Sequence, residues 1–195
     1  MLTFFSNLVG VKADKVMQAG VEALVRWDPQ SASEAELRTI LTPAVAAQSF
    51  ELCEIYTQLS EACREQGKLD EAAETAQRAL KLAQATGNSL LTAEAWRTLG
   101  RVLMSVTPAA DERLPHQTMP PAGDPESCFK ESLRIYQQIG AKGERARTLR
   151  LWAEFDLTCG RIEEARRKLT EARSSFVELG MAGDLEKAER LMQPA

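Results

Sequence analysis

Apolar residues recur at helical spacing in three stretches of the chain, and each stretch ends at a glycine. The stretches are ALKLAQATG at 79–87, SLRIYQQIG at 132–140 and ARSSFVELG at 172–180. Each opens on a small residue and reaches its glycine eight positions later. This is typical of the last two turns of an amphipathic helix that ends at a left-handed glycine. Because Ala, Leu, Glu and Arg dominate and β-branched runs are few, the pattern predicts an all-α fold.

The spacing of the three glycines predicts a repeat with one insertion. They are separated by 53 and then by 40 residues, so a period of 40 leaves 13 extra residues in the middle unit. Residues 107–124 hold four prolines and no helical periodicity, which predicts a loop insertion there. The other two units have near-identical tight turns at this place, QGKLDEA at 66–72 and CGRIEEA at 159–165. The repeat is therefore helix, short turn, helix.

This repeat assigns most of the chain to paired helices. We expect helices over 46–66 and 69–86 in the first unit, 90–106 and 125–139 in the second, and 143–159 and 162–179 in the third. Asp124 and Pro125 form a helix-start signal, with a capping carboxylate before a proline in the first turn. A last helix is expected over 184–193, with Asp184 as its start signal, and it should cap the array. The repeat domain is predicted to span 43–195.

Residues 1–42 do not follow the repeat and are predicted to form an N-terminal helical extension. A helical apolar pattern ends at Asp28-Pro29, and a capping box at Ser33 and Glu36 starts a second short helix. Apolar residues of segment 1–15 fall on one helical face. Three roles stay open for this segment: contact with a membrane surface, packing onto the array, or contact with a second copy of the chain in a homodimer.

Placing the three units on one register aligns large and small residues at fixed positions. In the first helices, Trp96, Leu99 and Gly100 align with Tyr56, Leu59 and Ser60 and with Leu149, Trp152 and Ala153; in the second helices, Ala72, Ala76 and Ala79 align with Pro125, Phe129 and Ser132 and with Ala165, Leu169 and Ala172. The pattern resembles the tetratricopeptide repeat, W-x-x-L-G in the first helix and A-x-x-x-F-x-x-A in the second. Small residues let paired helices approach, and large ones fill the space toward the next unit.

The resemblance covers residues 46–180 and implies three repeats in a right-handed array. The repeat region is similar to the tetratricopeptide tails of bacterial multidomain signalling proteins. The catalytic modules of those proteins have no counterpart in this sequence. The sequence departs from the family pattern in three ways. Its period is about 40 rather than about 34 residues, Asp156 stands at an apolar position, and Pro125 stands where Ala is expected.

The resemblance also implies a concave groove, lined by the first helices, that holds a partner peptide or helix. The positions carried over are Glu54, Thr57, Glu61, Arg64, Glu94, Arg97, Arg101, Met104, Arg147, Arg150, Glu154 and Leu157. If the guanidinium groups of Arg97, Arg101, Arg147 and Arg150 converge, they suit carboxylates, which indicates an acidic peptide or a chain terminus as ligand. The alternative is that these arginines pair with Glu94 and Glu154 on a solvated face.

Charge and composition narrow the function classes. Net charge is −4, from 24 basic and 28 acidic residues, which argues against nucleic acid as the main partner. No apolar run approaches the ~20 residues of a membrane span. The four cysteines form no C-x-x-C pair, so we expect buried free thiols in a reducing cytoplasm. His116 is the single histidine, and no metal, cofactor or phosphate-loop motif accompanies it.

The sequence therefore predicts a non-enzymatic protein-interaction module without a cofactor. We expect an adaptor or scaffold in a bacterial-type cytoplasm that binds a protein or peptide. Two alternatives remain at this stage. One is a membrane-surface protein that recruits partners through its N-terminal helix, and the other is the regulatory portion of a larger signalling enzyme.

Overall fold

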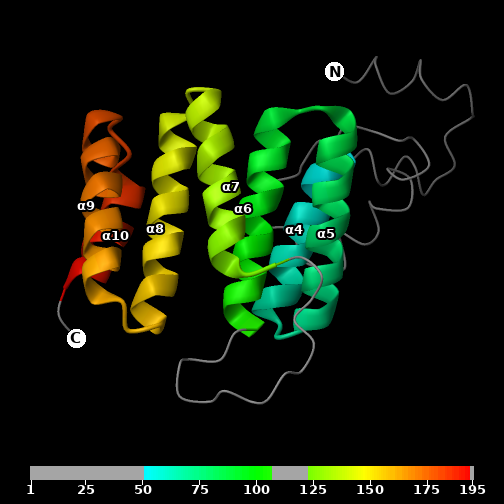
Figure 1. Ribbon diagram of the computed structural model, residues 1–195, viewed down its shortest axis with the longest axis horizontal. Helices are drawn as coiled ribbons and strands as arrows, with labels where there is room; N and C mark the ends of the chain where they lie inside the picture. The colour runs from blue at the N-terminus through cyan, green and yellow to red at the C-terminus, as the bar shows by residue number, and fades with distance from the viewer. Residues whose placement is uncertain (1–50, 107–122, 194–195) are drawn as a thin grey trace, which may run out of the picture.

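The computed structural model describes residues 51–106 and 123–193, and within these ranges all regular structure is α-helical. The helices are α4 (Glu51–Glu65), α5 (Leu69–Thr86), α6 (Ser89–Val106), α7 (Pro125–Gln138), α8 (Lys142–Thr158), α9 (Ile162–Glu178) and α10 (Ala182–Met192). Figure 1 shows the helix pairs following one another in a row, from α4 and α5 at one end to α9 and α10 at the other. The all-α prediction is confirmed. The predicted extension 1–42 and the loop positions 107–122 lie outside the described residues.

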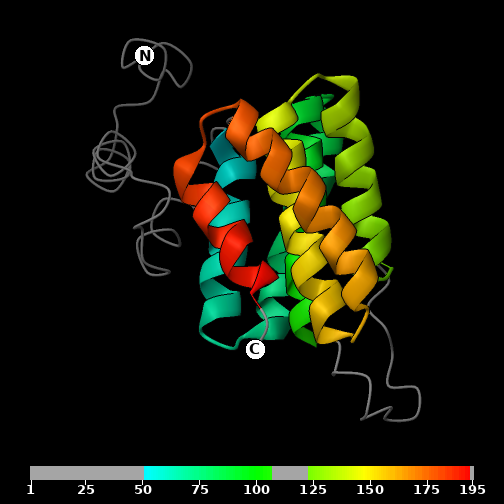
Figure 2. The ribbon, with the colours of Figure 1, turned by 90° about the vertical axis from the view of Figure 1, so that its left-hand side faces the viewer.

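The helices associate as the repeat predicts. The pairs α4 with α5, α6 with α7 and α8 with α9 each pack along their length. Neighbouring pairs join through α5 against α6 and α7 against α8, and α4 also reaches α6. Figure 2 looks onto the end of the row, where α10 packs beside α9. The first helices α4, α6 and α8 therefore follow one another along one side of the array.

The turns after α4, α7, α8 and α9 share one geometry. In each, a glycine takes a left-handed conformation, for example Gly140 at φ 70° and Gly180 at φ 68°. The next residue's N–H then donates to the carbonyl five positions back, as Ala141 does to Tyr136 at 2.9 Å and Met181 to Phe176 at 2.9 Å. This closure satisfies a carbonyl at the helix end and reverses the chain within three residues. The predicted helix ends therefore lie within a residue of the observed ones.

The start of the capping helix differs from the prediction. Helix α10 begins at Ala182, two residues before Asp184. The glycine turn at Gly180 leads directly into the helix, as the equivalent turn at Gly140 does for α8, so no capping carboxylate is needed. Asp184 instead lies in the first turn of α10 and reaches Arg147 of α8. By contrast, Asp124 caps α7 as predicted, since its carboxylate accepts the N–H of Ser127 at 2.9 Å.

Small residues mark the points where paired helices approach most closely. The aligned positions Ser60, Ala153, Ala79, Ser132 and Ala172 are all fully buried. A Cβ atom on Gly100 would lie 2.9 Å from Cε1 of Phe129 on α7, which is too close for a real contact. Phe129 in turn stacks on Trp152 of α8, with ring centroids 6.4 Å apart. The side chain of Phe129 thus packs against α6 within its own helix pair and against α8 of the next pair.

Asp156 is buried where the family pattern has an apolar residue, and two cations compensate it. Its side chain is 1% exposed. Nε of Arg161, in the turn before α9, donates to Oδ1 at 2.7 Å, and Nζ of Lys168 on α9 donates to Oδ2. Lys168 also lies over the ring of Trp152, 4.3 Å from its centroid. A buried ion triad therefore ties α8 to α9 at this position.

The cysteines are free thiols, as the sequence predicts. Cys53, Cys63 and Cys128 are buried, and Cys159 is partly exposed. Burial raises the pKa of Cys53 to about 11 and that of Cys128 to about 12. These two groups stay protonated at neutral pH and behave as small packing residues.

Replacing Gly100 by valine tests the close approach of α6 and α7. The added side chain has to displace Phe129, so we expect Gly100→Val to lower the free energy of unfolding by about 1–3 kcal/mol. Gly183→Val in α10 is the matched control, since a Cβ there meets nothing within 4 Å. Urea unfolding followed by circular dichroism measures both. Equal stability of the two variants would contradict the packing described here.

Removing the Asp156 carboxylate tests the ion triad. Asp156→Ala leaves the cations of Arg161 and Lys168 without their buried partner, so we expect a loss of about 2–4 kcal/mol in the free energy of unfolding. The control is Glu164→Ala, whose partner Arg167 is at the surface and whose loss should stay within about 0.5 kcal/mol. If Asp156→Ala lowers the free energy of unfolding no more than Glu164→Ala does, the buried triad stabilises the fold no more than the surface ion pair of Glu164 and Arg167.

Candidate functional site

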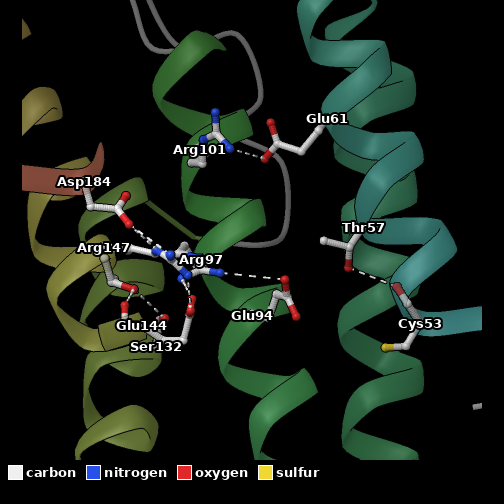
Figure 3. Close-up of polar contacts among 11 residues, drawn as sticks. Cys53, Thr57, Glu61, Glu94, Arg97, Arg101, Ser132, Glu144, Arg147 and Asp184 are labelled. Carbon is white, nitrogen blue, oxygen red and sulfur yellow. Dashed lines mark hydrogen bonds and ion pairs between the residues drawn. The ribbon is translucent and has the colours of Figure 1, made fainter. Parts of the chain in front are cut away.

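The predicted groove positions lie on the first helices α4, α6 and α8. We call the surface that they form the first-helix face. Glu54, Thr57, Glu61 and Arg64 belong to α4, Glu94, Arg97, Arg101 and Met104 to α6, and Arg147, Arg150, Glu154 and Leu157 to α8. Ion pairs connect these helices to one another, and Figure 3 shows several of the residues on adjacent ribbons.

Glu61 connects α4 to α6. One of its oxygens lies 2.9 Å from Nε of Arg64 on the same helix, and the other lies 3.0 Å from Nη1 of Arg101 on α6. Figure 3 shows the contact between Glu61 and Arg101 across the space between the two helices. Two of the predicted arginines therefore share one carboxylate.

Glu144 connects α6 to α8. Arg97 donates to one carboxylate oxygen of Glu144, and Arg147 donates to the other. The guanidinium of Arg97 also lies over the buried ring of Tyr136, 5.4 Å from its centroid. Sequence reasoning missed Glu144, because it precedes the aligned positions of α8. Its place in the first turn of α8, four residues after the turn glycine Gly140, is the signal that could have found it.

Asp184 connects α8 to α10 in the same manner. Its carboxylate oxygen lies 2.9 Å from Nη2 of Arg147 and accepts a hydrogen bond from Nε at 2.9 Å. Asp184 follows Gly180 by four residues, as Glu144 follows Gly140. The carboxylates of Glu144 and Asp184 thus occupy equivalent positions, each reaching back to the preceding first helix. We use the name acid–arginine ladder for the contacts that Glu61, Glu144 and Asp184 make with Arg97, Arg101 and Arg147 (Figure 3).

Arg150 and Glu94 of the first-helix face lie outside this ladder. Nη1 of Arg150 is 3.8 Å from Glu154, and its Nε is buried without a hydrogen-bond partner in the described part of the chain. Burial, together with the charges of Arg101 and Arg97, lowers the pKa of Arg150. Glu94 lies 3.7 Å from Nη2 of Arg97. Burial raises the pKa of Glu94, and the charge of Glu144 adds to the effect.

Two of the predicted positions are turned largely into the protein. Thr57 is buried, and its hydroxyl donates to the carbonyl of Cys53 at 3.0 Å. Met104 packs against the apolar cluster of Phe129, Leu151 and Phe155. Most of what this face presents to solvent is therefore charged.

The described side chains of this face offer charged groups together with hydrogen-bond donors and acceptors. Instead of sharing one site, the four predicted arginines are distributed: Arg97, Arg101 and Arg147 contact the three ladder carboxylates, and Arg150 lies near Glu154. Among the described residues, no three His, Cys, Asp or Glu side chains gather in a way that could hold a metal ion. In the same ranges, no helix is both long and apolar enough to cross a membrane.

Acid titration of two glutamine variants separates the roles of Glu144 and Glu94. Burial opposes ionisation of Glu144, but the charge and hydrogen bond of Arg97 outweigh it and lower its pKa. Ionised Glu144 therefore stabilises the fold above the unfolded pKa of about 4, and this stability is lost as pH falls through the lower native pKa. For Glu94, whose native pKa is raised, the contribution is present at low pH and lost as pH rises through the native pKa.

We expect opposite effects from the two substitutions at neutral pH. Glu144→Gln should lower the free energy of unfolding by about 1–3 kcal/mol, with the difference shrinking toward about pH 3. Glu94→Gln should leave stability unchanged or raise it, again with no difference at low pH. Urea unfolding across this pH range measures both. A destabilising Glu94→Gln of the same size as Glu144→Gln would contradict the assignment.

Comparison with known proteins agrees with this geometry. Residues 51–105 match the family model described as tetratricopeptide repeat. Among solved structures, BtubC (BKLC) from P. vanneervenii is similar with a TM-score of 0.56 and 19% sequence identity, over 91% of this chain and 75% of that one. At this identity the likeness shows the fold alone. None of the curated proteins compared with the chain matches it significantly. The family match identifies residues 51–105 as tetratricopeptide repeat sequence, and the described helices beyond them continue the same fold of paired helices.

Proposed function

We propose that the first-helix face binds a segment of another protein, and that the chain acts as a non-catalytic adaptor or scaffold. Tetratricopeptide repeats generally mediate protein–protein interaction, and repeat arrays present extended surfaces that suit this purpose. For this chain, the binding surface proposed is the row of part-exposed charged residues on α4, α6 and α8. Their number and spread fit an extended peptide or a helix better than a small ligand.

The observation that carries the proposal is the acid–arginine ladder. It holds long side chains from neighbouring repeats in fixed positions, through Glu61, Glu144 and Asp184. Fixing a flexible side chain on binding costs free energy, so a surface whose charged groups are already ordered binds a partner at lower cost. A solvated face with no binding role gains little from such order, because exposed ion pairs add little stability.

An acidic element of the partner fits Arg150 best. Arg97, Arg101 and Arg147 already contact ladder carboxylates, whereas the ion pair of Arg150 within the described ranges is a long one, 3.8 Å to Glu154. An acidic side chain or a chain terminus at Arg150 would supply the charge-assisted hydrogen bond that the guanidinium lacks. Free thiols at all four cysteines support a reducing cytoplasm as the compartment. A signalling role in a bacterial cell is part of the same proposal and rests on the family resemblance.

Site-specific photo-crosslinking tests which face binds. We expect a photoreactive residue at position 154, on α8, to crosslink a partner in cells that express the protein. The same residue at Ser174, exposed on the outer helix α9, should give no such product. Arg150→Glu should abolish the crosslink from position 154, while Arg134→Glu on α7, at the surface, should leave it intact. Equal crosslinking from positions 154 and 174 would rule out the first-helix face as the binding site.

A further inference from the structure

The first-helix face leaves two groups of opposite charge only partly compensated. Arg150 on α8 and Glu94 on α6 have longer charge contacts than the ladder residues, 3.8 Å and 3.7 Å, both beyond hydrogen-bond distance. Both are shielded from solvent, with side chains 15% and 32% exposed. A shielded charge without hydrogen bonds is unfavourable unless something else supplies the missing partner.

The repeat register explains why Arg150 has no close hydrogen-bonded carboxylate among the described residues. Arg150 follows Gly140 by ten residues, as Arg97 follows Gly87, so the two arginines occupy equivalent positions. Arg97 donates to Glu144 at the start of the next first helix. The acid equivalent to Glu144 for Arg150 is Asp184, and the Asp184 carboxylate is hydrogen-bonded to Arg147 instead. Arg150 is therefore left with the 3.8 Å contact to Glu154 on its own helix.

Glu94 lies on the other side of the same network. In Figure 3 its side chain projects from α6 into the space on the α4 side, away from Glu144 and Arg147. Its neighbour Arg97 directs its close hydrogen bond to Glu144 and leaves Glu94 at the longer distance. The carboxylate of Glu94 is thus the acidic counterpart of Arg150, one first helix earlier in the array.

We propose that the bound segment carries charges of both signs, with an acidic side chain on Arg150 and a basic side chain on Glu94. This deepens the proposed function and rests on it, because it specifies the chemistry of the partner. A uniformly acidic segment would place a carboxylate beside Glu94, which like-charge repulsion disfavours. A segment of mixed charge satisfies both groups at once and binds in one direction along the array.

Selection from a random peptide library displayed on phage tests the inference. With the full chain immobilised, we expect peptides that share one acidic and one basic residue at a fixed separation. Repeating the selection with Arg150→Gln should remove the preference for the acidic residue, and with Glu94→Gln the preference for the basic one. Glu131→Gln and Arg134→Gln on α7, a surface ion pair of the same residue types, are the matched controls and should change neither.

A double-mutant cycle on one selected peptide tests direct contact. We expect Arg150→Gln to weaken binding about tenfold, and alanine at the acidic residue of the peptide to weaken it no further in that variant. The same holds for Glu94→Gln and the basic residue. Circular dichroism confirms that each variant is folded.

The outcomes of these experiments distinguish the inference about the charges of the bound segment from the proposed function, which is peptide binding by the first-helix face. Selected peptides that lack the charge pair, or that show no coupling to Arg150 and Glu94, overturn the inference but leave a peptide-binding face. Failure to select any peptide, together with the absence of crosslinking from position 154, overturns both.

Discussion

The close approach of paired helices is the constraint on which the array depends. At Gly100 the α6 backbone comes so near to Phe129 that even one added methyl group would clash. The aligned positions Ser60 and Ala153 are also small and fully buried, and the hydroxyl of Ser60 donates to the carbonyl of Ala72 on the paired helix at 2.8 Å. Small residues at these positions let the paired helices approach, and large side chains such as Phe129 reach from one pair to the next.

That packing places the first helices in succession and so creates the first-helix face. Because α4, α6 and α8 follow one another along one side of the array, their charged residues meet across helix boundaries rather than within one helix. The recurrent turn geometry repeats the relation, which is why Glu144 and Asp184 contact the preceding first helix from equivalent positions. These two contacts of the ladder arise because the same turn is repeated in the backbone and an acidic residue, Glu144 or Asp184, stands at the same position after each turn.

The surroundings of Asp156 and Arg150 show how charge is tolerated inside such an array. Asp156 stands at an apolar position and is compensated by Arg161 and Lys168, whose side chains reach it from the next turn and the next helix. At Arg150 compensation is incomplete, since the carboxylate that the register would provide is bound to Arg147. The charge of Asp156 is compensated within the protein, and Arg150 is the residue for which we propose a partner carboxylate.

The sequence alone determined the helices, their ends and the repeat, because these depend on local periodicity, on the glycine of each turn and on small residues at a fixed spacing. It also placed the predicted binding positions on the correct helices. It did not determine which acid each arginine contacts, because Glu144 and Asp184 lie outside the aligned positions and 47 and 37 residues from Arg97 and Arg147. It likewise misplaced the start of α10 by reading Asp184 as a cap. Long-range pairing depends on how far the helices rotate and how closely they pack, and only the tertiary structure decides that.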